Sequence, residues 1–201
     1  MNNQLINEYE KHKNKITKRL EDFSSLMKRE YFFEYLFCLL TPQSNAQKCW
    51  QAVKAIKKLD KIDRETVREI LRTRTRFHNN KSLYLIEAIN NWNVVEKQLE
   101  EQEDIVKLRN WLADNVKGYG LKEASHFLRN IGRSGNKIAI LDRHILRNLK
   151  SLGIIEEERI KNKNSYFDIE KRFIFFSEEI GIPIDHLDLL FWSRENGEIF
   201  K

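Results

Sequence analysis

The chain has 201 residues, of which 41% are hydrophobic, so it is long enough to bury a core as one domain or as two small lobes. Its 36 lysines and arginines exceed its 30 aspartates and glutamates, and the resulting charge of +6 favours a polyanionic partner such as nucleic acid. With Cys38 and Cys49 as its two cysteines, the sequence excludes both a disulfide framework and a four-cysteine iron–sulfur cluster.

The N-terminal third of the chain is predicted to be helical. Residues 1–15 are polar, follow a helical pattern and carry no export signal. The apolar run YFFEYLFCLL at 31–40 is interrupted by Glu34 and is much shorter than the roughly 20 residues that a bilayer requires. We therefore expect a core helix at 31–40 and an intracellular protein without a membrane segment.

Helical spacing continues along the rest of the chain. Apolar residues recur at intervals of three and four over 105–112 and over 166–180, which places one apolar stripe on each helix. Only 7 glycines and 2 prolines are present, and strict alternation of apolar and polar residues is scarce. The sequence predicts an all-α fold of about nine or ten helices without a sheet.

Two helices joined by a tight glycine hairpin are predicted over about 105–131. Gly118-Tyr119-Gly120 is too short for a Walker loop, and no strand precedes it as a dinucleotide-binding fold requires. Such a hairpin exposes backbone N–H groups at the start of a helix, so Gly118 and Gly120 are expected to bind a DNA phosphate without reading sequence.

Lys122 falls in the first turn of the second helix of this motif. The helix dipole and partial burial both lower the pKa of an amine there, and a neutral amine is a nucleophile. His126 and Arg129 follow on the same helix face and are predicted to contact DNA. The spacing alone leaves three roles open for Lys122: a phosphate contact, a chemical role, or a solvated surface residue.

Asp142 ends a loop over about 132–143 and precedes the apolar helical pattern of Ile145, Leu146 and Leu149. This is the position of a helix N-cap, and capping alone explains an aspartate there. Capping also holds a carboxylate still, so the same residue suits a catalytic role beside Lys122.

The hairpin KGYGLKEASHFLRN followed by AILDRHIL resembles the helix-hairpin-helix DNA glycosylase superfamily, whose mark is a Gly-x-Gly-x-Lys hairpin and a later aspartate. The segments KEASHFLRN, LDRHIL and LDLLFW, with a final lysine, are similar more narrowly to the archaeal-type 8-oxoguanine DNA glycosylase/lyase family. The resemblance is dense over 105–150 and weaker over 71–90 and 183–201. It implies one glycosylase unit over 1–201, with two helical lobes and a DNA-binding cleft between them.

The resemblance also implies the reaction, which is excision of 8-oxoguanine followed by cleavage of the strand. Lys122 would attack C1′ of the damaged nucleoside and form a Schiff base that undergoes β-elimination. Asp142 would stay ionised and stabilise positive charge on the sugar. A monomer acting on duplex DNA is expected, with no soluble cofactor and no side-chain metal site, although the hairpin carbonyls are a candidate site for a monovalent cation.

Three residues match positions that recognise the oxidised base in this family. Phe77 and Trp192 match the aromatic walls around a base turned out of the duplex, and Lys201 matches a terminal lysine that takes part in its recognition. From residue type alone, Phe77 and Trp192 suit a protein core equally well. Lys201 taken alone suits a frayed chain end.

Two further positions match the DNA-facing side of the family less closely. Gln43 is the type of side chain that fills the gap in the base stack in the wider superfamily, but the narrow family has an Ala-Asn pair there, and a polar loop residue fits equally. Arg76 matches an arginine before the pocket phenylalanine. The basic residues that follow this phenylalanine in the family are replaced here, which weakens the expected phosphate contact.

Two other functions stay open from the sequence. A non-enzymatic helix-hairpin-helix DNA-binding module would use the hairpin and the positive charge equally well, but it would not need Asp142 or an aromatic pocket. A glycosylase for another damaged base is disfavoured where that branch carries a C-terminal four-cysteine cluster, because no cysteine follows Cys49. A monofunctional glycosylase would lack Lys122.

Overall fold

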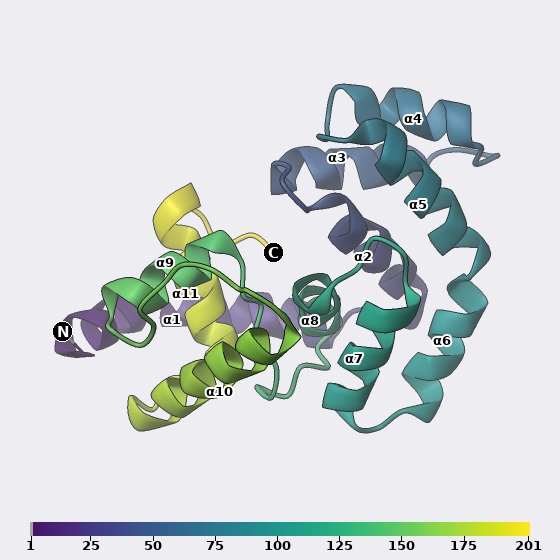
Figure 1. Ribbon diagram of the computed structural model, residues 1–201. Helices are drawn as coiled ribbons and strands as arrows, with labels where there is room; N and C mark the ends of the chain where they lie inside the picture. The colour runs from purple at the N-terminus through teal and green to yellow at the C-terminus, as the bar shows by residue number, and fades with distance from the viewer. Residues whose placement is uncertain (1) are drawn as a thin grey trace. The chain divides into compact units, whose positions relative to one another are not determined.

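The structure, a computed structural model, describes residues 2–201, without the side chains of residues 2, 195 and 196. Over this range the chain forms eleven α-helices and no strand, which confirms the predicted all-α class (Figure 1). In chain order the helices are α1 (Asn2–Ser24), α2 (Lys28–Leu40), α3 (Ala46–Ile56), α4 (Arg64–Arg72), α5 (His78–Asn90), α6 (Trp92–Glu101), α7 (Ile105–Asn115), α8 (Leu121–Asn130), α9 (Arg143–Ser151), α10 (Lys163–Glu179) and α11 (Ile184–Asn196).

The helix number exceeds the predicted nine or ten because several helix ends carry no glycine or proline. None of these breakers occurs between Pro42 and Gly118, yet α3 to α7 all lie there. Asp63 begins α4 by accepting a hydrogen bond from the Thr66 N–H at 3.0 Å, and α5 and α6 are separated by Asn91 alone. The Asp63 side chain satisfies a backbone N–H at the start of α4, whereas Asn91 makes no side-chain capping bond and its own N–H donates to the carbonyls of Glu87 and Ile89. Neither boundary is marked by a glycine or a proline.

The chain divides into two compact units. The first unit comprises Met1–Ser25 and Leu128–Lys201, and the second comprises Leu26–Phe127, so the division falls within α8. The predicted helix-hairpin-helix motif at about 105–131 corresponds to α7, the connecting residues 116–120, and α8.

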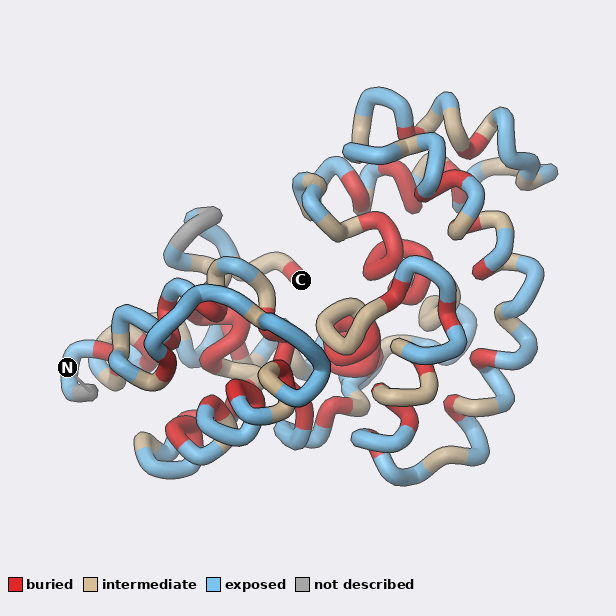
Figure 2. The backbone as a smooth tube through the Cα atoms, viewed as in Figure 1, coloured by how far each residue is buried: buried red, intermediate tan, exposed pale blue. Residues whose placement is uncertain are grey.

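The second unit has its core around α2. Seven consecutive residues of this helix are buried, from Glu34 to Leu40, which confirms the predicted core helix at 31–40 (Figure 2). A helix that is apolar on nearly all sides must be covered by neighbours, and both α3 and α5 pack against α2. The α4 and α5 helices pack against each other in the same unit (Figure 1).

The first unit buries the predicted apolar stripe of α10. Tyr166, Ile169, Phe173 and Phe176 are all buried, and the Phe173 ring stacks on Phe191 of α11 with 6.0 Å between the centroids. The α11 helix also packs against α1 and α9, so segments from both ends of the sequence share one core. Among the described residues, no helix combines the length and the apolar character that crossing a membrane requires.

Candidate active site

The hairpin between α7 and α8 requires glycine at position 118. Gly118 adopts φ = +90°, in the left-handed region, and a Cβ atom there would lie 2.8 Å from Cδ2 of Tyr84. The Tyr119 N–H donates to the Val116 carbonyl at 3.0 Å and closes the turn. The backbone of Gly118 therefore packs directly on an aromatic ring, and this contact fixes the hairpin against α5.

The first turn of α8 is closed by a glutamate. The Gly120 N–H donates to Oε2 of Glu123 at 3.1 Å, as in the reaching-back half of a capping box. The carboxylate thus occupies the N–H that was predicted to bind a phosphate, and a phosphate at this N–H must first displace it. Glu123 was missed in the sequence, although its position three residues after a glycine N-cap is a recognisable signal.

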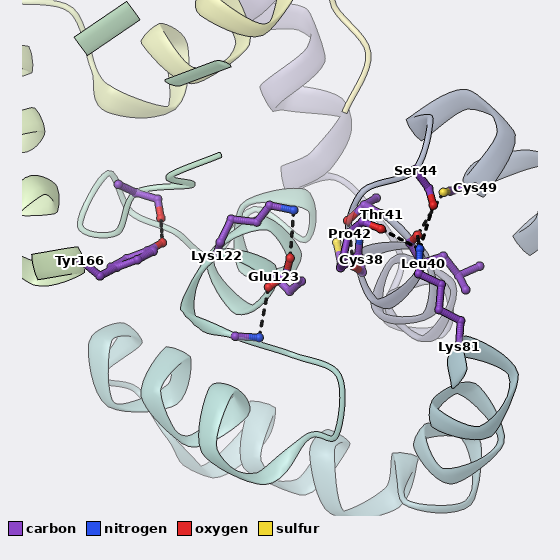
Figure 3. A network of polar contacts seen from close by, with 12 residues as sticks. Cys38, Leu40, Thr41, Pro42, Ser44, Cys49, Lys81, Lys122, Glu123 and Tyr166 are labelled. Carbon is purple, nitrogen blue, oxygen red and sulfur yellow. Dashed lines mark hydrogen bonds and ion pairs between the residues drawn. The ribbon is translucent and has the colours of Figure 1, made fainter. Parts of the chain in front are cut away.

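Lys122 is paired with the same glutamate. Its Nζ lies 3.0 Å from Oε1 of Glu123, and the two side chains are only 22% and 13% exposed (Figure 3). A solvated surface lysine would be far more exposed, so that interpretation does not fit the structure. The amine is held in the first turn of α8, next to the hairpin, by a carboxylate that also caps the helix.

A second lysine, Lys81 of α5, is buried in the same unit. Its Nζ donates to the carbonyls of Leu40 at 2.6 Å and Pro42 at 2.8 Å, and to Oγ of Ser44 at 2.8 Å (Figure 3). Burial lowers the pKa of Lys81 to about 8; the charge of Lys122 acts in the same direction, whereas Cys49 and Glu123 oppose it. Lys81 was missed because its partners lie about 40 residues away in the sequence.

Gln43, Arg76 and Phe77 all lie exposed on loops of the second unit. Phe77 is 54% exposed and is the residue before α5, so the alternative that it belongs to a core is wrong. The Arg76 guanidinium lies 5.8 Å from the centre of the Phe77 ring. Exposure of an aromatic ring beside a cation suits a contact with a nucleotide.

His126 and Arg129 do not form the exposed DNA-contacting face that their spacing from Lys122 predicted. His126 is 7% exposed and packs edge-on against Phe37 at 5.6 Å. Arg129 is 2% exposed, and its guanidinium lies 3.2 Å from the Asp188 carboxylate. All residues of α8 beyond its first turn are buried, so polar residue types did not mark a solvated face. Their burial does not support contact with DNA, which stays a prediction for both residues.

Asp142, in the first unit, caps α9 as predicted. Its Oδ1 accepts from the N–H groups of His144 at 2.8 Å and Ile145 at 2.9 Å. The carboxylate is therefore fixed by two backbone donors at the start of a helix. Capping holds the group still and is compatible with a further role for the residue.

The loop leading to Asp142 is held by two side chains of α10. The Ala139 N–H donates to Oε1 of Glu170 at 2.7 Å, and the Ala139 carbonyl accepts from the Tyr166 hydroxyl at 2.7 Å. Both side chains are buried. The sequence signal was present but unused: Glu170 is a carboxylate beside the apolar stripe of α10, where a charged group needs a partner.

The C-terminal tail is held within the first unit. The Trp192 ring, half-buried on α11, lies 6.2 Å from the Phe200 ring, and Nε of Arg19 donates to the Phe200 carbonyl. Lys201 is only 7% exposed. The alternative of a frayed end therefore does not apply to Lys201, which directly follows the phenylalanine that lies beside Trp192.

The predicted site residues fall into the two units as follows. The second unit contains Gln43, Arg76, Phe77, Gly118, Gly120, Lys122 and His126, and the first contains Arg129, Asp142, Trp192 and Lys201. Within the part of the chain that the structure describes, no group of three or more His, Cys, Asp or Glu side chains is placed to hold a metal ion.

An all-helical chain with a glycine hairpin, a lysine in the first turn after it and a later aspartate at a helix start has the fold of the helix-hairpin-helix DNA glycosylases. Comparison with known proteins narrows this class. The family described as 8-oxoguanine DNA glycosylase matches residues 16–182. The chain belongs to this 8-oxoguanine DNA glycosylase family.

Individual relatives match over nearly the whole chain. An 8-oxoguanine DNA glycosylase/AP lyase from Fusobacterium nucleatum is 39% identical and covers 99% of both sequences. The crystal structure of the Methanocaldococcus jannaschii 8-oxoguanine glycosylase/lyase with a 15mer DNA containing 8-oxoguanine is 33% identical, covers 98% of this chain and 100% of that one, and has a TM-score of 0.86. The 8-oxoguanine DNA glycosylase of Thermotoga maritima is 29% identical over the full length of both chains, with a TM-score of 0.87.

Proposed function

We propose that this protein excises 8-oxoguanine from DNA inside the cell and then cuts the strand at the resulting abasic site. The observation that carries the proposal is Lys122, a poorly exposed amine fixed in the first turn after the glycine hairpin. Relatives from bacteria and archaea that match nearly end to end are named for both activities. The alternatives, a non-enzymatic DNA-binding module and a glycosylase for another base, have no comparable support.

Lys122 acts as the nucleophile in this proposal. Its Nζ, once it has lost a proton, attacks C1′ while the bond from C1′ to the base breaks, and the base leaves with the electron pair and takes up a proton. The C1′–O4′ bond of the adduct then breaks, O4′ takes the electron pair and a proton, and a Schiff base forms between C1′ and Nζ. Loss of a proton from C2′ then expels the 3′ phosphate by β-elimination, which leaves a nicked strand.

Asp142 acts as the electrostatic partner. Two backbone donors hold its carboxylate in one orientation, so it needs little reorganisation as positive charge develops on the sugar ring. The clamp of Tyr166 and Glu170 on Ala139 fixes the loop that carries it. The carboxylate also suits transfer of the protons that the reaction moves.

Phe77, Trp192 and Lys201 recognise the oxidised base in this proposal. Compared with guanine, 8-oxoguanine carries an additional N–H donor at N7 and an oxygen acceptor at C8. A lysine beside aromatic side chains can form a hydrogen bond with one of these two groups. Gln43, Arg76 and the hairpin backbone at Gly118 and Gly120 contact the DNA. The enzyme works as a monomer on duplex DNA and needs no soluble cofactor, with a monovalent cation at the hairpin carbonyls as an accessory.

Borohydride trapping on a duplex that contains 8-oxoguanine tests the proposed function. A covalent protein–DNA complex is expected for the wild type and is expected to vanish in Lys122→Gln. The matched control is Lys117→Gln, which removes a 59% exposed lysine from the same hairpin and should still trap. Intact binding without any trapped complex would favour the non-enzymatic module, and trapping only with a different damaged base would reassign the substrate.

A further inference from the structure

Two loops of the second unit hold non-glycine residues in the left-handed backbone region. Gln43 has φ = +53° and Phe77 has φ = +58°, and within this unit they are the only described non-glycine residues with positive φ. Such residues persist only where the surrounding structure enforces the conformation, and they concentrate at functional sites. Both side chains are exposed, and both were assigned to DNA or base contact on independent grounds.

The loop of Gln43 is held by Lys81. The Lys81 amine spans the last residue of α2 and the loop beyond it, because it donates to Leu40 and Pro42 on one side and to Ser44 on the other. These three acceptors bracket Gln43 in the chain. An ammonium has three N–H donors, so the three acceptors satisfy it completely.

The loop of Phe77 is held by the same pair of residues. The Arg76 N–H donates to Oγ of Ser44 at 2.9 Å, so one hydroxyl joins the two loops. The Lys81 N–H donates to the Phe77 carbonyl at 2.9 Å in the first turn of α5. This bond is the ordinary helical one, so the Lys81 side chain reaches the loop of Phe77 through Ser44, and it holds the loop of Gln43 directly.

Lys81 is suited to this role by its burial. It is 5% exposed, so water does not compete for its three hydrogen bonds. Loss of the amine would leave the Pro42 carbonyl without this donor, while the Leu40 carbonyl would keep the Cys49 thiol and Oγ of Ser44 would keep the Arg76 N–H. A helix C-terminus can be capped by any donor. A lysine that also reaches the second loop through Ser44 couples the two exposed side chains geometrically.

We propose that Lys81 and Ser44 are positioning residues that hold Gln43 and Phe77 together in the orientation in which they engage lesion-containing DNA. This inference rests on the proposed function. It assigns to both residues an effect on the engagement of duplex DNA. Ser44 has none on the attack by Lys122 once an abasic site is bound, whereas the charge of Lys81 also acts on Lys122.

Steady-state kinetics on an 8-oxoguanine duplex tests the inference, with a short single strand carrying a pre-formed abasic site as the second substrate. In Lys81→Met and Ser44→Ala the KM for the duplex should rise about tenfold. The kcat on the abasic strand should change less than about twofold in Ser44→Ala, which leaves the charge near Lys122 unchanged. Ser44→Thr keeps the hydroxyl and should restore the duplex KM. Lys54→Met, which removes an exposed lysine of α3, controls for the lost charge.

Combining Lys81→Met with substitutions at Gln43 and Phe77 distinguishes a positioning effect from an effect of lowered stability. When Gln43 and Phe77 are both alanine, adding Lys81→Met should raise the duplex KM by less than about twofold, since the residues that it positions are gone. An undiminished tenfold effect in that background would overturn the inference. Equal losses on the duplex and the abasic strand, in proportion to lowered thermal stability, would also overturn it.

Amide hydrogen exchange gives a readout that does not depend on catalysis. The Arg76 amide should exchange faster in Ser44→Ala and Lys81→Met than in the wild type, while the amides within α2 stay protected. If the wild type traps no DNA, the proposed function fails. The positioning role can then still be tested by the exchange rate of the Arg76 amide and by the affinity for duplex DNA. Unchanged Arg76 exchange in both variants would refute that role whatever the activity.

Discussion

Oε1 of Glu123 lies 3.0 Å from Nζ of Lys122, and Oε2 of the same carboxylate accepts the Gly120 N–H. One side chain thus closes the helix start and pairs with the proposed nucleophile. A neighbouring carboxylate favours the charged form of an amine, whereas attack on C1′ requires the neutral form. The pair therefore holds the amine in place but opposes its reaction until the proton leaves.

Replacing Glu123 separates these two effects. Glu123→Gln keeps an oxygen that accepts the Gly120 N–H and removes the charge beside Lys122, so the single-turnover rate on an abasic site at neutral pH should rise a few-fold. Glu123→Ala removes the cap as well and should lower stability by about 1 kcal/mol. Rapid-quench kinetics and urea unfolding measure the two quantities. A slower Gln variant with unchanged stability would instead assign the carboxylate a role in proton transfer.

The hydrogen bond from the Tyr166 hydroxyl to the Ala139 carbonyl predicts that removing this hydroxyl lowers the excision rate. Tyr166→Phe leaves the buried Ala139 carbonyl without its donor, which should cost about 1 to 3 kcal/mol of unfolding free energy and loosen the loop that carries Asp142. Excision under single-turnover conditions should slow more than duplex binding weakens. Tyr31→Phe, in α2, serves as the matched control and should be neutral. A destabilised Tyr166→Phe with wild-type excision rates would show that the loop position does not depend on this bond.

The proposed role of Lys201 predicts that its substitution affects a substrate with 8-oxoguanine and a substrate with an abasic site to different extents. If it recognises the oxidised base, Lys201→Ala should reduce excision of 8-oxoguanine far more than cleavage of a pre-formed abasic site, because the second substrate carries no base to read. Comparing the two rates in the same duplex sequence provides the measurement. Equal losses on both would mean that Lys201 supports the fold of the tail and does not read the lesion.

Lys81 predicts a pH dependence of stability. Its pKa is lowered to about 8 from its usual 10.5, so between these values the unfolded chain holds a proton that the folded chain has lost. The unfolding free energy of the wild type relative to Lys81→Met should therefore rise as pH increases from about 8 to 10.5. Denaturant unfolding at several pH values measures this difference.

Three other ionisable groups act on Lys81, namely Cys49, Lys122 and Glu123. Burial raises the pKa of Cys49 from 9.0 to about 11, which makes stability fall with pH between these values, opposite in sign to the effect of Lys81. The thiol is present in both proteins, but Lys81 lowers its pKa, so its contribution cancels only in part when wild type and variant are compared. Without Lys81 the variant loses more stability as pH rises, so the part that remains has the same sign as the effect of Lys81. A difference that falls with pH would mean that the folded protein holds Lys81 charged.

Local sequence patterns predicted the parts of the candidate site that depend on neighbours in the chain. The hairpin glycines and the Asp142 cap follow from residues within a few positions of each other, and the structure has both. Lys81 and Ser44 act across 37 positions, so only the packed fold reveals their pairing. The burial of Arg129 was not foreseen for a related reason, since its partner Asp188 lies on another helix and makes burial of a guanidinium acceptable.

The tail of the chain has a consequence for how the protein is prepared. Arg19 of α1 binds the Phe200 carbonyl, the Phe200 ring lies against Trp192, and Lys201 is buried. A purification tag fused after Lys201 would begin at a buried residue and would disturb these contacts. Such a fusion should therefore reduce excision of 8-oxoguanine even when the protein is folded.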